Sequence, residues 1–170
     1  MVKAVCKQER RRFIGAVFAI IITAYFLNCF VIGFICVNGE SMEPNLKDGS
    51  YVLVLKNGYL LSEPQRFDVI VFPYRYRNDR YYMKRIIGLP GEVVHIHDGM
   101  IFINGEVLVE SYGLAEIEDA RGAGEPIMLA ADEYFVLGDN RNNSTDSRDT
   151  DIGNITKEDI TGKVLMWHEN

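Results

Sequence analysis

Three polar stretches of this chain carry residue types that acyl transfer requires. Ser41 stands in the turn GESMEP (residues 39–44), where the glycine permits a positive φ and the proline biases the residue before it away from helix. Lys84 lies in the middle of YYMKRIIG (81–88), and GDNRNNSTDSR (138–148) is a polar loop rich in hydrogen-bonding groups. Acyl transfer needs an activated nucleophile, a base for its proton and donors for the oxyanion. The three stretches contain candidates for each role.

Lys84 is the candidate base because of its neighbours in the predicted strand. Strand alternation places its side chain on the same face as Tyr82 and Ile86. Burial among such groups disfavours the charged amine and lowers the pKa of a lysine. A serine paired with a lysine is a known variant of the serine–histidine arrangement. The alternative is a surface lysine whose stem lies along apolar groups while its amine stays in water.

Histidine and cysteine usage argues against the other common chemistries. His95 and His97 share one face of a predicted hairpin strand and His168 is near the end of the chain, so we interpret them as surface or packing residues. The cysteines, which are Cys6, Cys29 and Cys36, all precede the predicted body. That body therefore has no cysteines for a disulfide framework or a zinc site. No metal and no cofactor is expected.

Residues 13–37 form an uncharged, mostly apolar run. As a helix at about 1.5 Å per residue it would measure roughly 37 Å, enough for a hydrocarbon core of about 30 Å. The apolar part of a cleavable signal peptide is shorter, about 7–15 residues. The sequence therefore predicts a basic cytoplasmic segment over residues 1–12, a transmembrane helix over 13–37 and an extracytoplasmic catalytic domain over 38–170.

Charge supports this orientation and excludes one class of partner. Five basic residues against one acidic residue give residues 1–12 a net charge of +4, and because the whole chain carries −6, the remainder carries −10. A basic flank tends to stay cytoplasmic, which predicts a single-pass protein of the cell membrane in contact with the lipid bilayer. An acidic body whose dense basic cluster lies beside an apolar run is not typical of nucleic-acid binding.

The remainder of the chain indicates short strands separated by turns. Alternating or apolar runs predict strands over residues 50–55, 67–72, 81–88, 92–97, 100–103, 133–137 and 161–167. Asp98-Gly99 and Asn104-Gly105 are typical hairpin turns. Residues 111–132 are expected to be a loop. The predicted fold class is mainly β, with an N-terminal transmembrane helix followed by an all-β body of packed antiparallel sheets.

The segments SMEPNL, YYMKRIIGLPGE and GDNRNNSTDSR, in this order, resemble the type I signal peptidase family. The resemblance runs from the apolar run to the C-terminus. It implies a membrane-bound serine endopeptidase that removes N-terminal signal peptides from secreted preproteins by a Ser/Lys dyad, with a fold like that of signal peptidases and LexA. Two positions depart from the family. Asn45 replaces the usual threonine, and Gly39 stands where some members carry a serine hydroxyl.

The resemblance also implies roles for individual residues. Ser41 is the nucleophile, with its own N–H as oxyanion donor, and Lys84 is the general base. Ser144 supplies a hydroxyl that orients Lys84. The supporting residues implied around them are Gly39, Tyr82, Arg85, Asp139, Asp146 and Arg148, with Asp139–Arg85 and Asp146–Arg148 as ion pairs. The substrate is expected to bind as an extended strand beside residues 67–72 or beside the Lys84 strand.

Two alternative functions stay open at this point. A LexA-like self-cleaving protein would need a DNA-binding module and an internal cleavage site, and neither is visible. A non-catalytic assembly factor, as in pilus biogenesis, could lose the serine or the lysine, yet Ser41 and Lys84 are both present. Sequons at Asn142, Asn143 and Asn154 are interpreted as chance matches, since a glycan at the first two would crowd the site.

Overall fold

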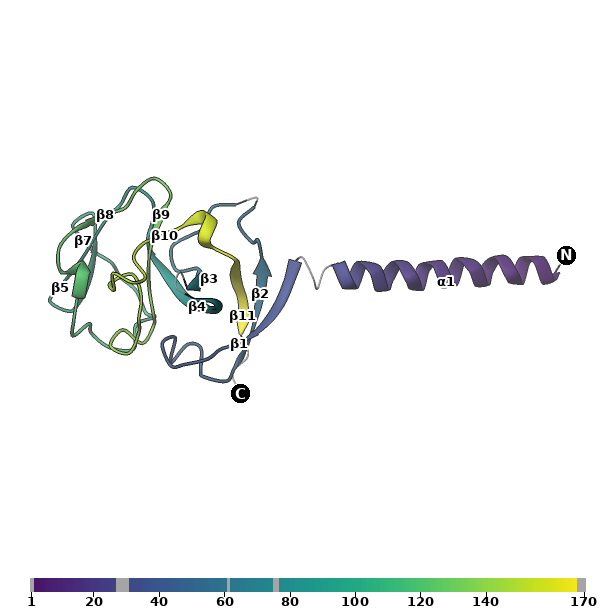
Figure 1. The fold of residues 1–170 in the computed structure, drawn as a ribbon, viewed down its shortest axis with the longest axis horizontal. Coiled ribbons are helices and arrows are strands. Elements are labelled where there is room, and N and C mark those ends of the chain that lie inside the picture. Colours follow the sequence, from purple (N-terminus) through teal and green to yellow (C-terminus); the bar gives the residue numbers. More distant parts are fainter. Residues whose placement is uncertain (1, 27–30, 61, 75–76, 168–170) are drawn as a thin grey trace.

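The computed structural model of the chain describes residues 2–26, 31–60, 62–74 and 77–167. Helix α1 (Val2–Phe26) extends away from a β body made of two antiparallel sheets (Figure 1). The large sheet has the order β1-β2-β11-β3-β4-β9-β10. Its strands are β1 (Ile32–Cys36), β2 (Tyr51–Lys56), β3 (Val69–Tyr74), β4 (Arg77–Gly88), β9 (Glu133–Leu137), β10 (Ile155–Thr156) and β11 (Gly162–Trp167).

The small sheet has the order β7-β6-β5-β8 and lies at the end of the body remote from α1 (Figure 1). Its strands are β5 (Val93–His97), β6 (Met100–Ile103), β7 (Glu106–Val107) and β8 (Ile127–Met128). Asp98 and Gly99 both have positive φ, 49° and 74°, as a two-residue type I′ hairpin turn requires. Single 3-10 turns occur at Arg121–Gly124 and Lys157–Asp159.

Buried apolar side chains join these elements in three clusters. One lies between the sheets and combines Ile87, Phe135 and Leu137 of the large sheet with side chains of β5 and β6. A second covers one face of the large sheet around Ile70 and Ile86. The third packs the turn after Ser41 onto the sheet through Met42, Leu46, Val52, Val54, Val69, Val71 and Val164. The nucleophile turn is therefore anchored by the core.

The mainly β, antiparallel character of the body agrees with the prediction, but the predicted transmembrane helix over residues 13–37 is wrong. Within the described residues, no helix is both long enough and apolar enough to cross a membrane. The apolar run is divided: α1 ends at Phe26, and Ile32–Cys36 forms β1, which pairs antiparallel with β2. The helical part, residues 13–26, measures roughly 21 Å, which is short of a hydrocarbon core of about 30 Å.

Most predicted strands are present, with shifts at their ends. Two strands, Met100–Ile103 and Glu133–Leu137, have the predicted bounds. The strand carrying Lys84 is longer than predicted because it begins at Arg77. β1 was missed, since its residues belonged to the presumed helix. The predicted loop over residues 111–132 contains a 3-10 turn and the short strand β8.

Candidate active site

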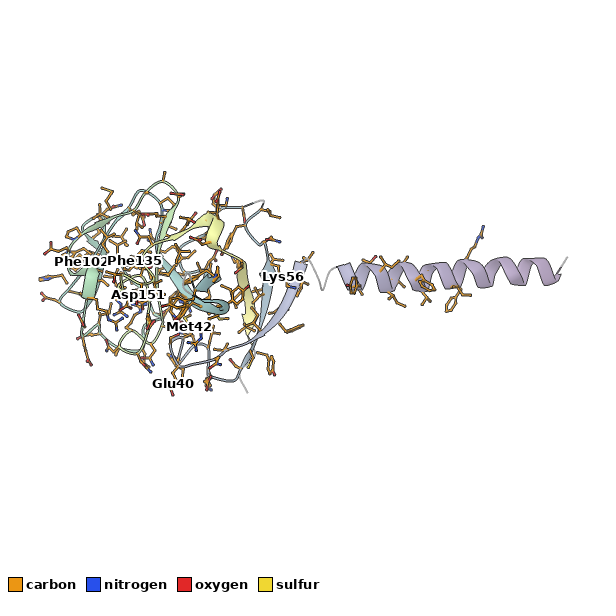
Figure 2. The ribbon with its side chains drawn as sticks, viewed as in Figure 1. Glu40, Met42, Lys56, Phe102, Phe135 and Asp151 are labelled. Atoms are coloured by element: carbon orange, nitrogen blue, oxygen red, sulfur yellow. The ribbon has the colours of Figure 1, made fainter. Side chains whose placement is uncertain are left out.

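Ser41 lies in a tight turn between β1 and β2 whose apolar side chains anchor it. Met42 and Leu46 are each 1% exposed, and the Leu46 N–H donates to the Met42 carbonyl. Gly39 has a φ of 98°, and its N–H donates to Asp48 Oδ1 at 2.8 Å. Figure 2 places Met42 within the body and Glu40 at its edge, in agreement with a buried methionine and an exposed glutamate. The turn thus holds Ser41 half-buried on the face of the large sheet.

Lys84 lies beside this serine. Its side chain projects from β4, is 1% exposed, and its Nζ lies 2.7 Å from Ser41 Oγ. The same amine donates to the Met83 carbonyl at 3.0 Å. Burial lowers the pKa of Lys84 to about 8, while the carboxylates of Asp146 and Asp139 raise it and offset part of this effect. At pH 7.4 this leaves about one amine in five neutral, against about one in a thousand for a solvated lysine.

Aromatic and aliphatic side chains provide the desolvation. The Tyr82 ring centroid lies 5.3 Å from Lys84 Nζ, and Tyr82 packs edge-on against Tyr74 and stacks on Phe72. Ile86, two residues after the lysine, is fully buried. Tyr82, Lys84 and Ile86 therefore share one environment, as strand alternation predicts.

The loop over residues 138–148 reaches the same place. Ser144 is 6% exposed, and its Oγ is buried without a hydrogen-bond partner in the described part of the chain. A Cβ added to Gly138 would lie 2.3 Å from Ser144 Oγ and 2.5 Å from the Ser41 carbonyl oxygen, so only glycine at position 138 leaves room for the Ser144 side chain and the Ser41 carbonyl. The structure places Ser144 against the nucleophile turn but shows no hydrogen bond from it to Lys84, so its orienting role stays a prediction.

Two buried ion pairs hold this loop. Arg85 donates to Asp139 through Nε and Nη2 at 2.8 and 2.6 Å. Arg148 donates to Asp146 through Nε and Nη2 at 2.8 and 2.9 Å. None of the four side chains is more than 3% exposed. The pairings implied by the family resemblance are therefore present, both as two parallel hydrogen bonds.

Two further residues contact the Arg85–Asp139 ion pair and were not singled out from the sequence as functional. Asn45 Nδ2 donates to Asp139 Oδ2 at 2.9 Å and to the Tyr112 carbonyl at 3.0 Å. The Tyr112 ring lies 3.8 Å from the guanidinium carbon of Arg85. Asn45 had a signal, its departure from the family's threonine. Tyr112 had none, because a long-range contact leaves no local pattern.

Beside Ser41 and Lys84 runs a groove of about 490 Å³. One wall is formed by residues 35–39, which are the end of β1 and the residues that follow it. The other wall is formed by residues 80–84 of β4, and Met42 and Val71 also line the groove. The backbone of residues 81–84 is paired with β3 on one side, whereas β9 pairs with β4 only from Arg85 onward. The groove thus exposes a strand edge beside the serine.

The histidines lie elsewhere. His95 and His97 stack on each other at 5.8 Å between ring centroids, with a ring nitrogen of His95 3.1 Å from the Gly124 carbonyl oxygen. His168 lies outside the described residues. Over the part of the chain that the structure describes, no group of three His, Cys, Asp or Glu side chains could hold a metal ion.

In this antiparallel β body a serine hydroxyl lies against a buried lysine amine, and a serine paired with a lysine is one variant of the serine–histidine arrangement in hydrolases. The family model described as "Signal peptidase, peptidase S26" matches residues 10–168. The chain is 34% identical over 154 residues to "Signal peptidase I" of Bacillus amyloliquefaciens, covering 86% of this chain and 81% of that protein. It is 34% identical over 155 residues to "Signal peptidase I S" of Bacillus subtilis, with coverages of 86% and 82%.

A crystal structure of a signal peptidase I from Enterococcus faecalis aligns with 62% of this chain and 98% of that chain, at 36% identity and a TM-score of 0.49. On the family match and the curated relatives, the chain belongs to the signal peptidase family, peptidase S26. It is a serine endopeptidase that removes signal peptides, and preproteins bearing them are its substrates. A LexA-like self-cleaving protein and a non-catalytic assembly factor are not favoured.

Proposed function

We propose that the chain cleaves signal peptides by a Ser/Lys dyad, with Ser41 as nucleophile and Lys84 as general base. The observation that carries this proposal is the 2.7 Å contact between Ser41 Oγ and a buried amine whose pKa is lowered to about 8. A general base works best when its pKa is near the operating pH, and this lysine meets that condition.

In the proposed reaction the neutral Lys84 amine takes the Ser41 proton as Oγ attacks the scissile carbonyl carbon. The Ser41 N–H donates no hydrogen bond to another described residue, so it is free to stabilise the oxyanion. Lys84 then returns the proton to the leaving amine, and the acyl group remains on Ser41 as an ester. Water activated by the same lysine hydrolyses this ester and restores the serine.

We further propose that the preprotein binds as an added strand along residues 80–84, in the groove beside Ser41. β3, the other predicted neighbour, is not available, because Ile70 and Val71 are paired with β4 on one side and β11 on the other. The side chains of Ile35, Val37 and Met83 provide apolar walls for small residues before the cleaved bond.

The catalytic body is proposed to comprise residues 38–170 together with β1, which pairs into the large sheet. Its proposed location is the extracytoplasmic side, because signal peptides are removed from chains that are being exported. Contact of the basic residues 1–12 with a lipid bilayer stays a prediction from their charge.

Replacing Ser41 with alanine should abolish cleavage, because no other group replaces the nucleophile. The full-length protein would be incubated in detergent with a purified preprotein, and the released signal peptide and mature chain quantified. Ser62→Ala is the matched control, since Ser62 is an exposed serine whose hydroxyl donates to the Gly58 carbonyl. Unchanged cleavage by Ser41→Ala would refute the proposed nucleophile.

Replacing Ser144 with alanine should lower kcat by about tenfold to a hundredfold, the cost of misaiming a reacting group. The Lys84 amine makes two hydrogen bonds, and the buried Ser144 hydroxyl has no other described partner. Stability should not fall, because the hydroxyl makes no hydrogen bond among the described residues that the variant would lose. Steady-state kinetics and thermal unfolding measure both effects. Wild-type kcat would show that Ser144 does not orient the base.

A further inference from the structure

The segment between β7 and β8 lies across the loop that carries Ser144. We call residues 108–126 the strap and residues 138–149 the catalytic loop. Backbone hydrogen bonds join the two: Leu114 N–H to the Asp139 carbonyl at 3.0 Å, and Gly122 N–H to the Arg148 carbonyl at 3.1 Å. Asn142 adds two more, accepting from the Glu118 N–H and donating to the Glu116 carbonyl. The position of the catalytic loop therefore depends on the strap.

Arg121 is the strap residue that reaches nearest to the proposed chemistry. Its Nη1 donates to the Ser144 carbonyl oxygen at 2.8 Å and to Asp149 Oδ2 at 2.7 Å. Asp149 Oδ2 also accepts from the Asp146 N–H at 3.0 Å. One guanidinium nitrogen thus ties the backbone of Ser144 to the end of the catalytic loop.

The backbone at Arg121 is held in an unfavourable conformation. Its φ is 49°, in the left-handed region that a glycine would occupy without cost. The Arg121 N–H donates a hydrogen bond to Asp119 Oδ1 at 2.9 Å, and the N–H of the neighbouring Gly122 donates one to the Arg148 carbonyl. Such strain persists where the surroundings over-determine it, and it clusters at functional sites. Here it aims the arginine side chain at Ser144.

We propose that Arg121 is a positioning residue for the cleavage reaction. By fixing the carbonyl of Ser144, it sets the direction of the Ser144 hydroxyl, which in turn orients the Lys84 amine. This inference rests on the proposed Ser/Lys dyad and on the proposed role of Ser144. It assigns to a residue outside the three family segments a part in aligning the base.

The contacts favour a role in geometry over a role in stability. The Arg121 and Asp149 side chains are 28% and 29% exposed, and ion pairs near the surface contribute little to stability. The carbonyl that Arg121 holds, in contrast, belongs to a residue that is 6% exposed and lies against Ser41. A small displacement there alters the alignment of reacting groups, on which rate depends steeply.

The test compares Arg121→Met with Arg66→Met in the full-length protein. Arg66 is a matched control, because it also bridges a backbone carbonyl, that of Ile87, and a carboxylate, that of Glu92, at 22% exposure. Arg121→Met should lower kcat about tenfold with KM and melting temperature nearly unchanged, and Arg66→Met should leave kcat unchanged. Arg121→Lys should restore part of kcat, since an ammonium can donate to both oxygens. Wild-type kcat in Arg121→Met, or an equal loss in Arg66→Met, would overturn the proposal.

A double variant separates this inference from the function on which it rests. If Arg121 acts through Ser144, then Arg121→Met should cost no further activity in a Ser144→Ala background. A full additional tenfold loss in that background would refute the assignment. If Ser41→Ala and Lys84→Met are inactive while Arg121→Met is normal, the dyad stands and only the positioning role fails.

Discussion

Replacing Lys84 with methionine is expected to abolish cleavage of a preprotein while leaving the protein folded. The side chain is 1% exposed and surrounded by Tyr82 and Ile86, so methionine of similar length fits the same apolar site. It cannot accept the proton of Ser41. Lys84→Arg should be inactive as well, because a guanidinium stays protonated.

Lys84→Met should be more stable than the wild type at neutral pH. Burial lowers the pKa of Lys84 from 10.5 to about 8, so between these values the unfolded chain binds more protons than the folded one. Stability contributed by this group therefore rises with pH across that window, and below about pH 8 the whole penalty, about 3 kcal/mol, applies. Methionine carries no such penalty, and denaturant unfolding at pH 7 measures the gain.

Activity as a function of pH checks the role of the base independently. For the wild type, kcat/KM should rise with pH through about 8, as the folded-state pKa of Lys84 dictates. Lys163→Met is the matched control: Lys163 lies in β11, 30% exposed and paired with Asp68, and its loss should leave the profile unchanged. Cleavage by Lys84→Met at the wild-type rate would exclude Lys84 as the base.

Replacing Asp139 with alanine is expected to cost about 3–5 kcal/mol of unfolding free energy. Asp139 is fully buried, and its partner Arg85 is 2% exposed, so the variant leaves a guanidinium charge in the core with its carboxylate removed. The hydrogen bond from Asn45 is lost with it. In a domain of this size the change corresponds to a fall in melting temperature of about 6–20 °C.

Two comparisons make this prediction specific. Glu63→Gln breaks the exposed pair with Lys157 and should cost no more than about 1 kcal/mol. The double variant Arg85→Met with Asp139→Leu removes both charges and should recover most of the lost stability, because the penalty comes from the unpaired charge. If Asp139→Ala melts at the wild-type temperature, the pair does not hold the catalytic loop.

Local sequence patterns determined much of the β body. The strand Glu133–Leu137 and the Asp98-Gly99 turn were predictable because alternation and positive φ are properties of neighbouring residues. Ser41 and Lys84 could be proposed for a different reason. Neither a turn serine nor a lysine in an apolar strand is distinctive alone, but together with the polar loop over 138–148 their segments resemble the type I signal peptidase family, and that resemblance singled them out.

Only the tertiary structure decided the pairing of β1 and the contact between Arg121 and Ser144. Residues 13–37 are apolar whether lipid or a neighbouring strand covers them, so periodicity could not show that Ile32–Cys36 pairs with β2 instead of continuing a helix. Arg121 lies in a segment with no periodic pattern, and Ser144 is 23 positions away in sequence. A contact at that distance depends on how the two sheets bring the strap and the catalytic loop together, and no local preference encodes it.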